Sequence, residues 1–86
     1  MSKTITKFWG DGCMNCKALT PILDDVKKDY NDIEFREQNS KDADAMKKYE
    51  ITTLPTLVFE KDGVEVGRLM GLRPKSLIAK KIAEVF

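Results

Sequence analysis

The chain of 86 residues contains no histidine, only two cysteines and five glycines. Without histidine, Ser-His-Asp and Cys-His catalysis are excluded, and so are nearly all mixed Cys/His zinc sites. Two cysteines cannot close a four-thiolate metal site within one chain. The glycines match neither the dinucleotide-binding fingerprint nor the P-loop, which excludes a loop that cradles phosphate. The remaining chemistry is concentrated at Cys13 and Cys16.

Charge of one sign and long apolar runs are also lacking. The net charge of +1 shows no basic excess, so we expect no nucleic-acid binding. No apolar run reaches the roughly 18 residues of a transmembrane helix, and residues 1–7 lack the apolar stretch of a secretory signal. We therefore expect a cytoplasmic protein with no membrane partner. The length and the balance of 42% hydrophobic to 34% charged residues predict one domain, 1–86, and we expect a monomer.

Periodicity and turn residues predict seven secondary-structure elements. They are a strand at 4–9, a helix at 13–30, a strand at 33–37, a helix at 41–49, strands at 55–59 and 64–70, and a last helix that has Pro74 at its first position. In the first helix, one apolar face recurs at spacings of three and four residues and consists of Cys16, Leu19, Leu23, Val26 and Tyr30. Pro21 lies inside this helix and should bend it.

The order of these elements predicts the architecture. A strand, a helix and a second strand form a β-α-β unit with parallel strands, and Asp62-Gly63 indicates a hairpin between the last two strands. The fold class is therefore α/β, with a mixed four-stranded sheet and helices on both faces. We expect Asn39 or Ser40 to cap the second helix. Four apolar residues of the last helix should face inward, namely Leu77, Ile78, Ile82 and Val85.

The two cysteines are expected to differ in exposure and acidity. Gly10 to Gly12 end the first strand, so Cys13 stands at a helix N-terminus, where free N–H groups and the helix dipole favour a negative charge. We expect the pKa of the Cys13 thiol to lie below its usual value of about 8.5. Cys16 lies one turn later on the apolar face. This asymmetry predicts that Cys13 attacks a partner disulfide and that Cys16 resolves the mixed disulfide.

Other interpretations of the cysteine pair are a structural disulfide, a metal or iron–sulfur site, and two inert buried thiols. A structural disulfide would close a single helical turn, where the gain from loop closure is smallest. A metal or cluster site would need thiolates from a second chain. A Cys-x-x-Cys motif beside a β-α-β unit favours a redox function. We therefore expect no metal and no organic cofactor.

Further segments stand at characteristic distances from the cysteines. They are Phe8-Trp9 before Cys13-Met14-Asn15-Cys16-Lys17, Pro21 five residues later, Leu54-Pro55-Thr56-Leu57, and the glycines Gly63 and Gly71. With these segments the chain resembles the thioredoxin family over nearly its whole length, beginning at the family's active-site strand. The resemblance implies a trimmed thioredoxin-like fold and a thiol–disulfide oxidoreductase. It also implies disulfide-containing proteins as substrates and a thioredoxin-reductase-like or other electron donor.

The resemblance implies roles for residues around the cysteines. It implies a cis peptide bond at Pro55, packed against the cysteine pair, and a backbone at Leu54 that pairs with an extended segment of the partner. Partner contacts are implied for six residues in all, namely Trp9, Gly12, Met14, Leu54, Pro55 and Gly71. Lys7 and Lys17 are candidates for tuning the cysteine pKa values.

Three features of the sequence depart from the family pattern. Gly12 stands where many thioredoxins have a bulky residue, and Met14-Asn15 replaces the common Gly-Pro, so the reduction potential cannot be carried over. Lys7 occupies the position of a buried aspartate that assists proton transfer at the second cysteine. We expect the Lys7 ammonium to reach solvent. The alternative is a buried lysine that favours the Cys16 thiolate or acts as a neutral base.

Two alternative functions stay open at this point. One is a glutaredoxin-like electron donor to a dedicated partner such as ribonucleotide reductase, although Met70-Gly71-Leu72 stands where glutaredoxins have a Gly-Gly pair. The other is a binding subunit with the thioredoxin fold whose cysteines are dispensable.

Overall fold

A computed structural model describes residues 2–86 of the chain. Met1, which belongs to the predicted domain 1–86, lies outside the described residues. The element order agrees with the prediction. The elements are β1 (Lys3–Trp9), α1 (Met14–Lys27), β2 (Ile33–Asn39), α2 (Ala43–Lys48), β3 (Thr56–Lys61), β4 (Val64–Met70) and α3 (Lys75–Val85).

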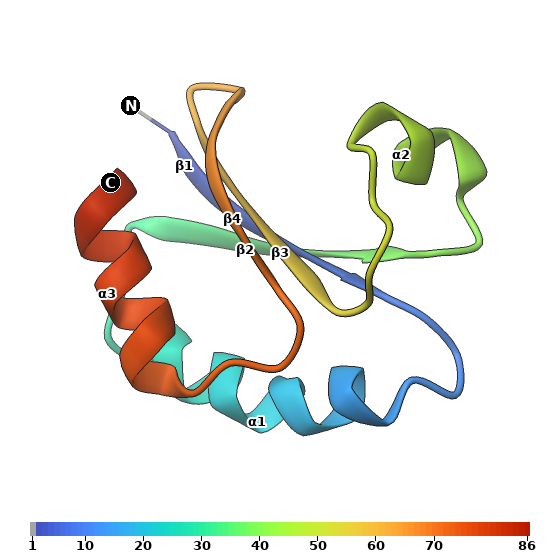
Figure 1. The fold of residues 1–86 in the computed structure, drawn as a ribbon. Helices are drawn as coiled ribbons and strands as arrows, with labels where there is room; N and C mark the ends of the chain where they lie inside the picture. The colour runs from blue at the N-terminus through green and yellow to red at the C-terminus, as the bar shows by residue number, and fades with distance from the viewer. Residues whose placement is uncertain (1) are drawn as a thin grey trace.

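The four strands form one mixed sheet in the order β2-β1-β3-β4. β1 pairs with β2 in parallel, whereas the β1–β3 and β3–β4 pairs are antiparallel. Figure 1 shows α1 and α3 on one side of the sheet and α2 on the other. The predicted α/β architecture with helices on both faces is therefore confirmed. Asp62 and Gly63 both have positive φ, as the predicted two-residue hairpin turn requires.

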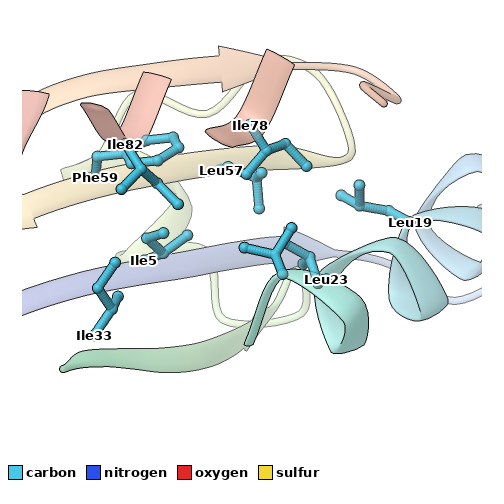
Figure 2. Close-up of a cluster of buried hydrophobic side chains, with 9 residues drawn as sticks. Ile5, Leu19, Leu23, Ile33, Leu57, Phe59, Ile78 and Ile82 are labelled. Carbon is cyan, nitrogen blue, oxygen red and sulfur yellow. The ribbon is translucent and has the colours of Figure 1, made fainter. Parts of the chain in front are cut away.

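The main core lies between the sheet and the pair α1 and α3 (Figure 2). Strand and helix side chains interdigitate there, and the buried cluster consists of Ile5, Leu19, Leu23, Val26, Ile33, Leu57, Phe59, Ile78 and Ile82. Four residues of the apolar face predicted for the first helix are buried, namely Cys16, Leu19, Leu23 and Val26. The fifth, Tyr30, lies beyond the end of α1 and is half-buried. α1 begins a few residues after the end of β1. The packing of its buried face on the sheet fixes the position of the helix end that carries the cysteines.

The opposite face of the sheet is covered more thinly. α2 buries none of its own residues. The ring of Tyr49, the residue after α2, packs against Phe8 with ring centroids 5.3 Å apart. Arg68 on β4 donates a hydrogen bond of 2.9 Å to the carbonyl of Tyr49, which ties this end of α2 to the sheet.

Local details of two helices, α2 and α3, differ from the predictions. Asp42 caps α2, not Asn39 or Ser40, because the helix begins at Ala43 and the Asp42 carboxylate accepts a hydrogen bond from the N–H of Ala45 at 3.1 Å. Pro74 is the N-cap of α3 and not its first residue.

Leu77 was also predicted wrongly. It is 44% exposed, because successive helical residues are about 100° apart and Ile78 and Ile82 already occupy the inward face. Pro21 does lie inside α1, where it has no N–H to donate; the bend stays a prediction. Among residues 2–86, no helix is long and apolar enough to span a bilayer.

Candidate active site

A tight turn connects β1 to α1 and carries the first cysteine. The N–H of Cys13 donates to the carbonyl of Gly10 at 3.3 Å, which closes a four-residue turn. Gly12, the third residue of this turn, has φ +75°, a conformation in which glycine is strongly favoured. The space around its Cα is open, so backbone conformation and not packing requires a glycine here.

Cys13 is the N-cap of α1, and its sulfur performs the capping. Its Sγ accepts a hydrogen bond from the N–H of Cys16 at 3.2 Å, the bond that a serine or aspartate makes at most helix starts. The first turn contains no acidic residue, so no side-chain carboxylate within it competes for the free N–H groups. A negative charge on Cys13 is therefore favoured by the helix start itself.

A disulfide joins Cys13 and Cys16, whose Cα atoms are 5.3 Å apart. Cys13 is half-buried, whereas Cys16 is only 3% exposed. The predicted difference in burial is therefore present in the structure. Cys16 lies on the same buried face of α1 as Leu19, so Cys13 is the more accessible of the two residues.

A surface cavity of about 430 Å³ opens beside the cysteines. It is lined by Lys7, Trp9, Gly10, Asp11, Gly12, Cys16, Lys17, Thr20 and Glu37. Four of the residues singled out from the sequence therefore share this cavity with Cys16, namely Lys7, Trp9, Gly12 and Lys17. Met14, the first residue of α1, is 75% exposed and is not among the lining residues.

A second segment approaches the cysteine turn from β3. The Leu54–Pro55 peptide bond is cis, as the resemblance implied, and Pro55 is buried. Gly71 has φ +83° and donates its N–H to the carbonyl of Pro55 at 2.7 Å, which places it beside this segment. A Cβ on Gly10 would lie 2.9 Å from Cδ1 of Leu54. Leu54 therefore packs directly against the turn that carries Cys13.

The side chain of Lys7 does not reach solvent, so that expectation is wrong. Its side chain is 6% exposed, and its ammonium donates to Oγ1 of Thr20 at 2.9 Å and pairs with Oε1 of Glu37 at 3.2 Å. Lys7 and Glu37 are directly paired residues of the parallel strands β1 and β2. The ammonium stays inside because these two partners satisfy it there.

Thr20 and Glu37 were not singled out from the sequence. Thr20 also donates its hydroxyl to the carbonyl of Cys16 at 3.3 Å, so it links Lys7 to the second cysteine. The alternation of β2 places Glu37 on the same face as Ile33, but its partner on β1 depends on the strand register. That register depends on how the intervening helix packs on the sheet. The one sequence signal for the pairing was the opposite charge of Lys7 and Glu37.

Comparison with known proteins gives consistent results. The family model described as Thioredoxin matches residues 1–84. Thioredoxin of Chlamydia pneumoniae is 33% identical over 82 residues, which cover 91% of this chain and 78% of that protein. Thioredoxin of Staphylococcus aureus is 33% identical over 79 residues, which cover 88% of this chain and 75% of that protein. Fasciola hepatica thioredoxin superimposes with a TM-score of 0.89 at 27% identity, covering 99% of this chain and 82% of that one.

The sheet order, the capping cysteine and the shielded second cysteine define a thiol–disulfide oxidoreductase. The chain belongs to the thioredoxin family. Members of this family act on disulfide substrates and are reduced by thioredoxin reductase.

Proposed function

We propose that this protein reduces disulfides of other proteins, with Cys13 as the nucleophile and Cys16 as the resolving cysteine. The observation that carries the proposal is the unequal placement of the two sulfurs. Cys13 caps the helix at the surface, and Cys16 is buried one turn behind it. A thiolate is the reactive form of cysteine, and the helix start favours that form at Cys13.

The reaction proceeds in two exchanges. The Cys13 thiolate attacks one sulfur of the partner disulfide, a Cys13–partner bond forms, and the other partner sulfur leaves as a thiolate. Cys16 then loses its proton and attacks the Cys13 sulfur, and the second partner sulfur leaves. The partner has gained two electrons, and the protein holds the Cys13–Cys16 disulfide seen in the structure. A reductase restores the dithiol by supplying two electrons and two protons.

The partner segment is proposed to bind along Leu54 and Pro55. Leu54 is only partly buried and lies against the cysteine turn, so a chain extended along its backbone comes next to Cys13. Such main-chain pairing makes few demands on sequence, which suits a reductant of many proteins. Trp9, Gly12, Met14 and Gly71 would border that segment.

Two serine variants test the assignment. Cys13→Ser should abolish turnover of a protein disulfide, because the attacking thiolate is gone. Cys16→Ser should make the first exchange only, and so accumulate a mixed disulfide that a reducing agent releases. The controls are each variant's unfolding curve and circular dichroism. If Cys13→Ser still reduces disulfides, or if Cys16→Ser traps nothing, the assignment of the two cysteines is wrong.

The same variants separate the alternatives. A binding subunit with dispensable cysteines predicts that Cys13→Ser keeps its partner and its role. A glutaredoxin-like donor predicts recycling by glutathione in place of a thioredoxin-reductase-like protein. The monomeric state, the absence of nucleic-acid and membrane partners, and the cytoplasmic location stay predictions from the sequence.

A further inference from the structure

Lys7 is the one charged side chain among the buried residues of the described chain. Burial of an ammonium is costly unless the charge is paired and hydrogen-bonded. The Lys7 ammonium forms an ion pair with Glu37 and a hydrogen bond to Thr20. Glu37 is itself 59% exposed, so the pair joins the interior to the surface. The reaction proposed above needs no ion pair at this place, so the pair calls for an explanation of its own.

The Lys7–Glu37 pair borders the same cavity as Cys16. Lys7, Thr20 and Glu37 line the same cavity as Cys16, whereas Cys13 is not among its lining residues. Thr20 bonds both the Lys7 ammonium and the Cys16 carbonyl. The fixed positive charge therefore lies on the cavity side of the second cysteine.

Other charged groups face this cavity. Lys17 on α1 is exposed, and Asp11 in the cysteine turn pairs with Lys41 at 2.8 Å. Of these, Lys7 alone is held away from water, where a charge acts through a lower dielectric and is screened less. Lys7 therefore contributes a positive charge from the buried wall of the cavity, whereas the exposed Lys17 and Glu37 contribute charges of opposite sign from its solvent side.

We propose that Lys7 is a positioning residue for the resolving step, and that its ammonium, fixed by Thr20 and Glu37, favours the thiolate of Cys16. This inference rests on the proposed function and adds an electrostatic cause for the second exchange. Cys16 gives its proton to solvent through the cavity. Its sulfur then forms the bond to Cys13, and the bond from Cys13 to the partner breaks.

The size of the effect follows from two opposed terms. Without the positive charge we expect about tenfold less Cys16 thiolate at a pH where Cys16 is mostly protonated. A more basic thiolate is also a better nucleophile, which offsets about threefold of that loss. Removal of the charge should therefore slow the second exchange about three- to fourfold at low pH and should not slow it once Cys16 is fully ionised.

Reaction of the reduced protein with dithiobis(nitrobenzoate) resolves the two exchanges. The first coloured thiolate is released when Cys13 attacks the probe, and the second when Cys16 resolves the adduct. Lys7→Met should leave the first phase unchanged and slow the second about three- to fourfold near about pH 6, with the slowing lost or reversed at a pH high enough to ionise Cys16 fully. Lys7→Arg keeps the charge and should restore the second phase. Lys80→Met, an exposed lysine of α3, controls for net charge.

Lys7→Gln keeps a hydrogen-bonding side chain at this position and removes the positive charge. A purely structural role for Lys7 predicts a normal second phase in this variant; the electrostatic role predicts a second phase as slow as in Lys7→Met. An unchanged second phase in Lys7→Met, a slowing that persists at high pH, or a normal second phase in Lys7→Gln overturns the inference.

The inference and the proposed function fail in distinguishable ways. If the unaltered protein shows no first phase, Cys13 is not the nucleophile and the proposed function fails. The inference is then decided in Cys13→Ser, where the ultraviolet absorbance of the Cys16 thiolate is titrated directly. Adding Lys7→Met should reduce the thiolate about tenfold at low pH. An unchanged titration overturns the inference there too.

Discussion

The Lys7–Glu37 pair makes an asymmetric prediction for stability. The Lys7 side chain is 6% exposed and that of Glu37 is 59% exposed. Lys7→Met removes the buried charge and leaves a carboxylate that water already solvates, so no buried group loses its partner. Glu37→Gln keeps the shape but leaves the ammonium buried beside neutral acceptors. Glu37→Gln should therefore destabilise the protein, whereas Lys7→Met should not.

The magnitude follows from the pair's geometry. Two unit charges about 4 Å apart interact by about 1 kcal/mol in water and about 4 kcal/mol at the effective dielectric near a protein surface. Nζ and Oε1 are 3.2 Å apart, but the exposure of Glu37 screens the pair toward the lower figure. We expect Glu37→Gln to cost about 1–2 kcal/mol. Lys7→Met should change stability by less than about 1 kcal/mol or increase it, since apolar replacements of buried charges are often neutral or stabilising.

Urea unfolding followed by far-ultraviolet circular dichroism measures both changes, with the disulfide intact in every variant. For a domain of this size each kcal/mol corresponds to about 4–8 °C in Tm, so a thermal scan gives an independent check. A loss of stability in Lys7→Met greater than that in Glu37→Gln would refute the reasoning. It would mean that the ammonium stabilises the fold by more than its burial costs.

Three further predictions concern the frame of the site, and urea unfolding measures each of them. Gly12→Ala should cost about 1–2 kcal/mol because φ is +75° there; no measurable loss would contradict the turn geometry. Glu50→Gly should gain up to about 1 kcal/mol, because Glu50 ends α2 at φ +52° in a position that favours glycine, and a loss would contradict this. Ile78→Ala should lower the free energy of unfolding by about 2–5 kcal/mol because Ile78 is buried. Leu77→Ala, at the exposed neighbouring residue, should lower it by less than about 1 kcal/mol; equal losses would contradict the assigned faces of α3.

The order of the elements and the place of the cysteines could be predicted from the sequence because local signals decide them. The spacing of Cys16, Leu19 and Leu23 fixes one helix face, and the glycines before Cys13 fix where that helix begins. The hairpin at Asp62 and Gly63 is equally local, because few residues other than glycine, asparagine and aspartate adopt positive φ.

The surroundings of Lys7 could not be predicted, because three distant segments create them. Whether a lysine on β1 meets Glu37 depends on the register of two strands joined by a long helix, and whether it meets Thr20 depends on how that helix is rotated. Apolar alternation constrains both quantities but specifies neither. The wrong inward assignment of Leu77 has a related cause, since two adjacent apolar residues cannot both occupy the centre of one helix face.

The central claim is that one sulfur is reactive at the surface while the other is shielded. It is tested most directly by timed alkylation of the reduced protein with iodoacetamide near about pH 7, with the modified residue identified by mass spectrometry of peptides. The placement of Cys13 at the helix cap and the burial of Cys16 predict that Cys13 is alkylated at least about tenfold faster than Cys16. Equal rates at the two cysteines, or faster modification of Cys16, would contradict it.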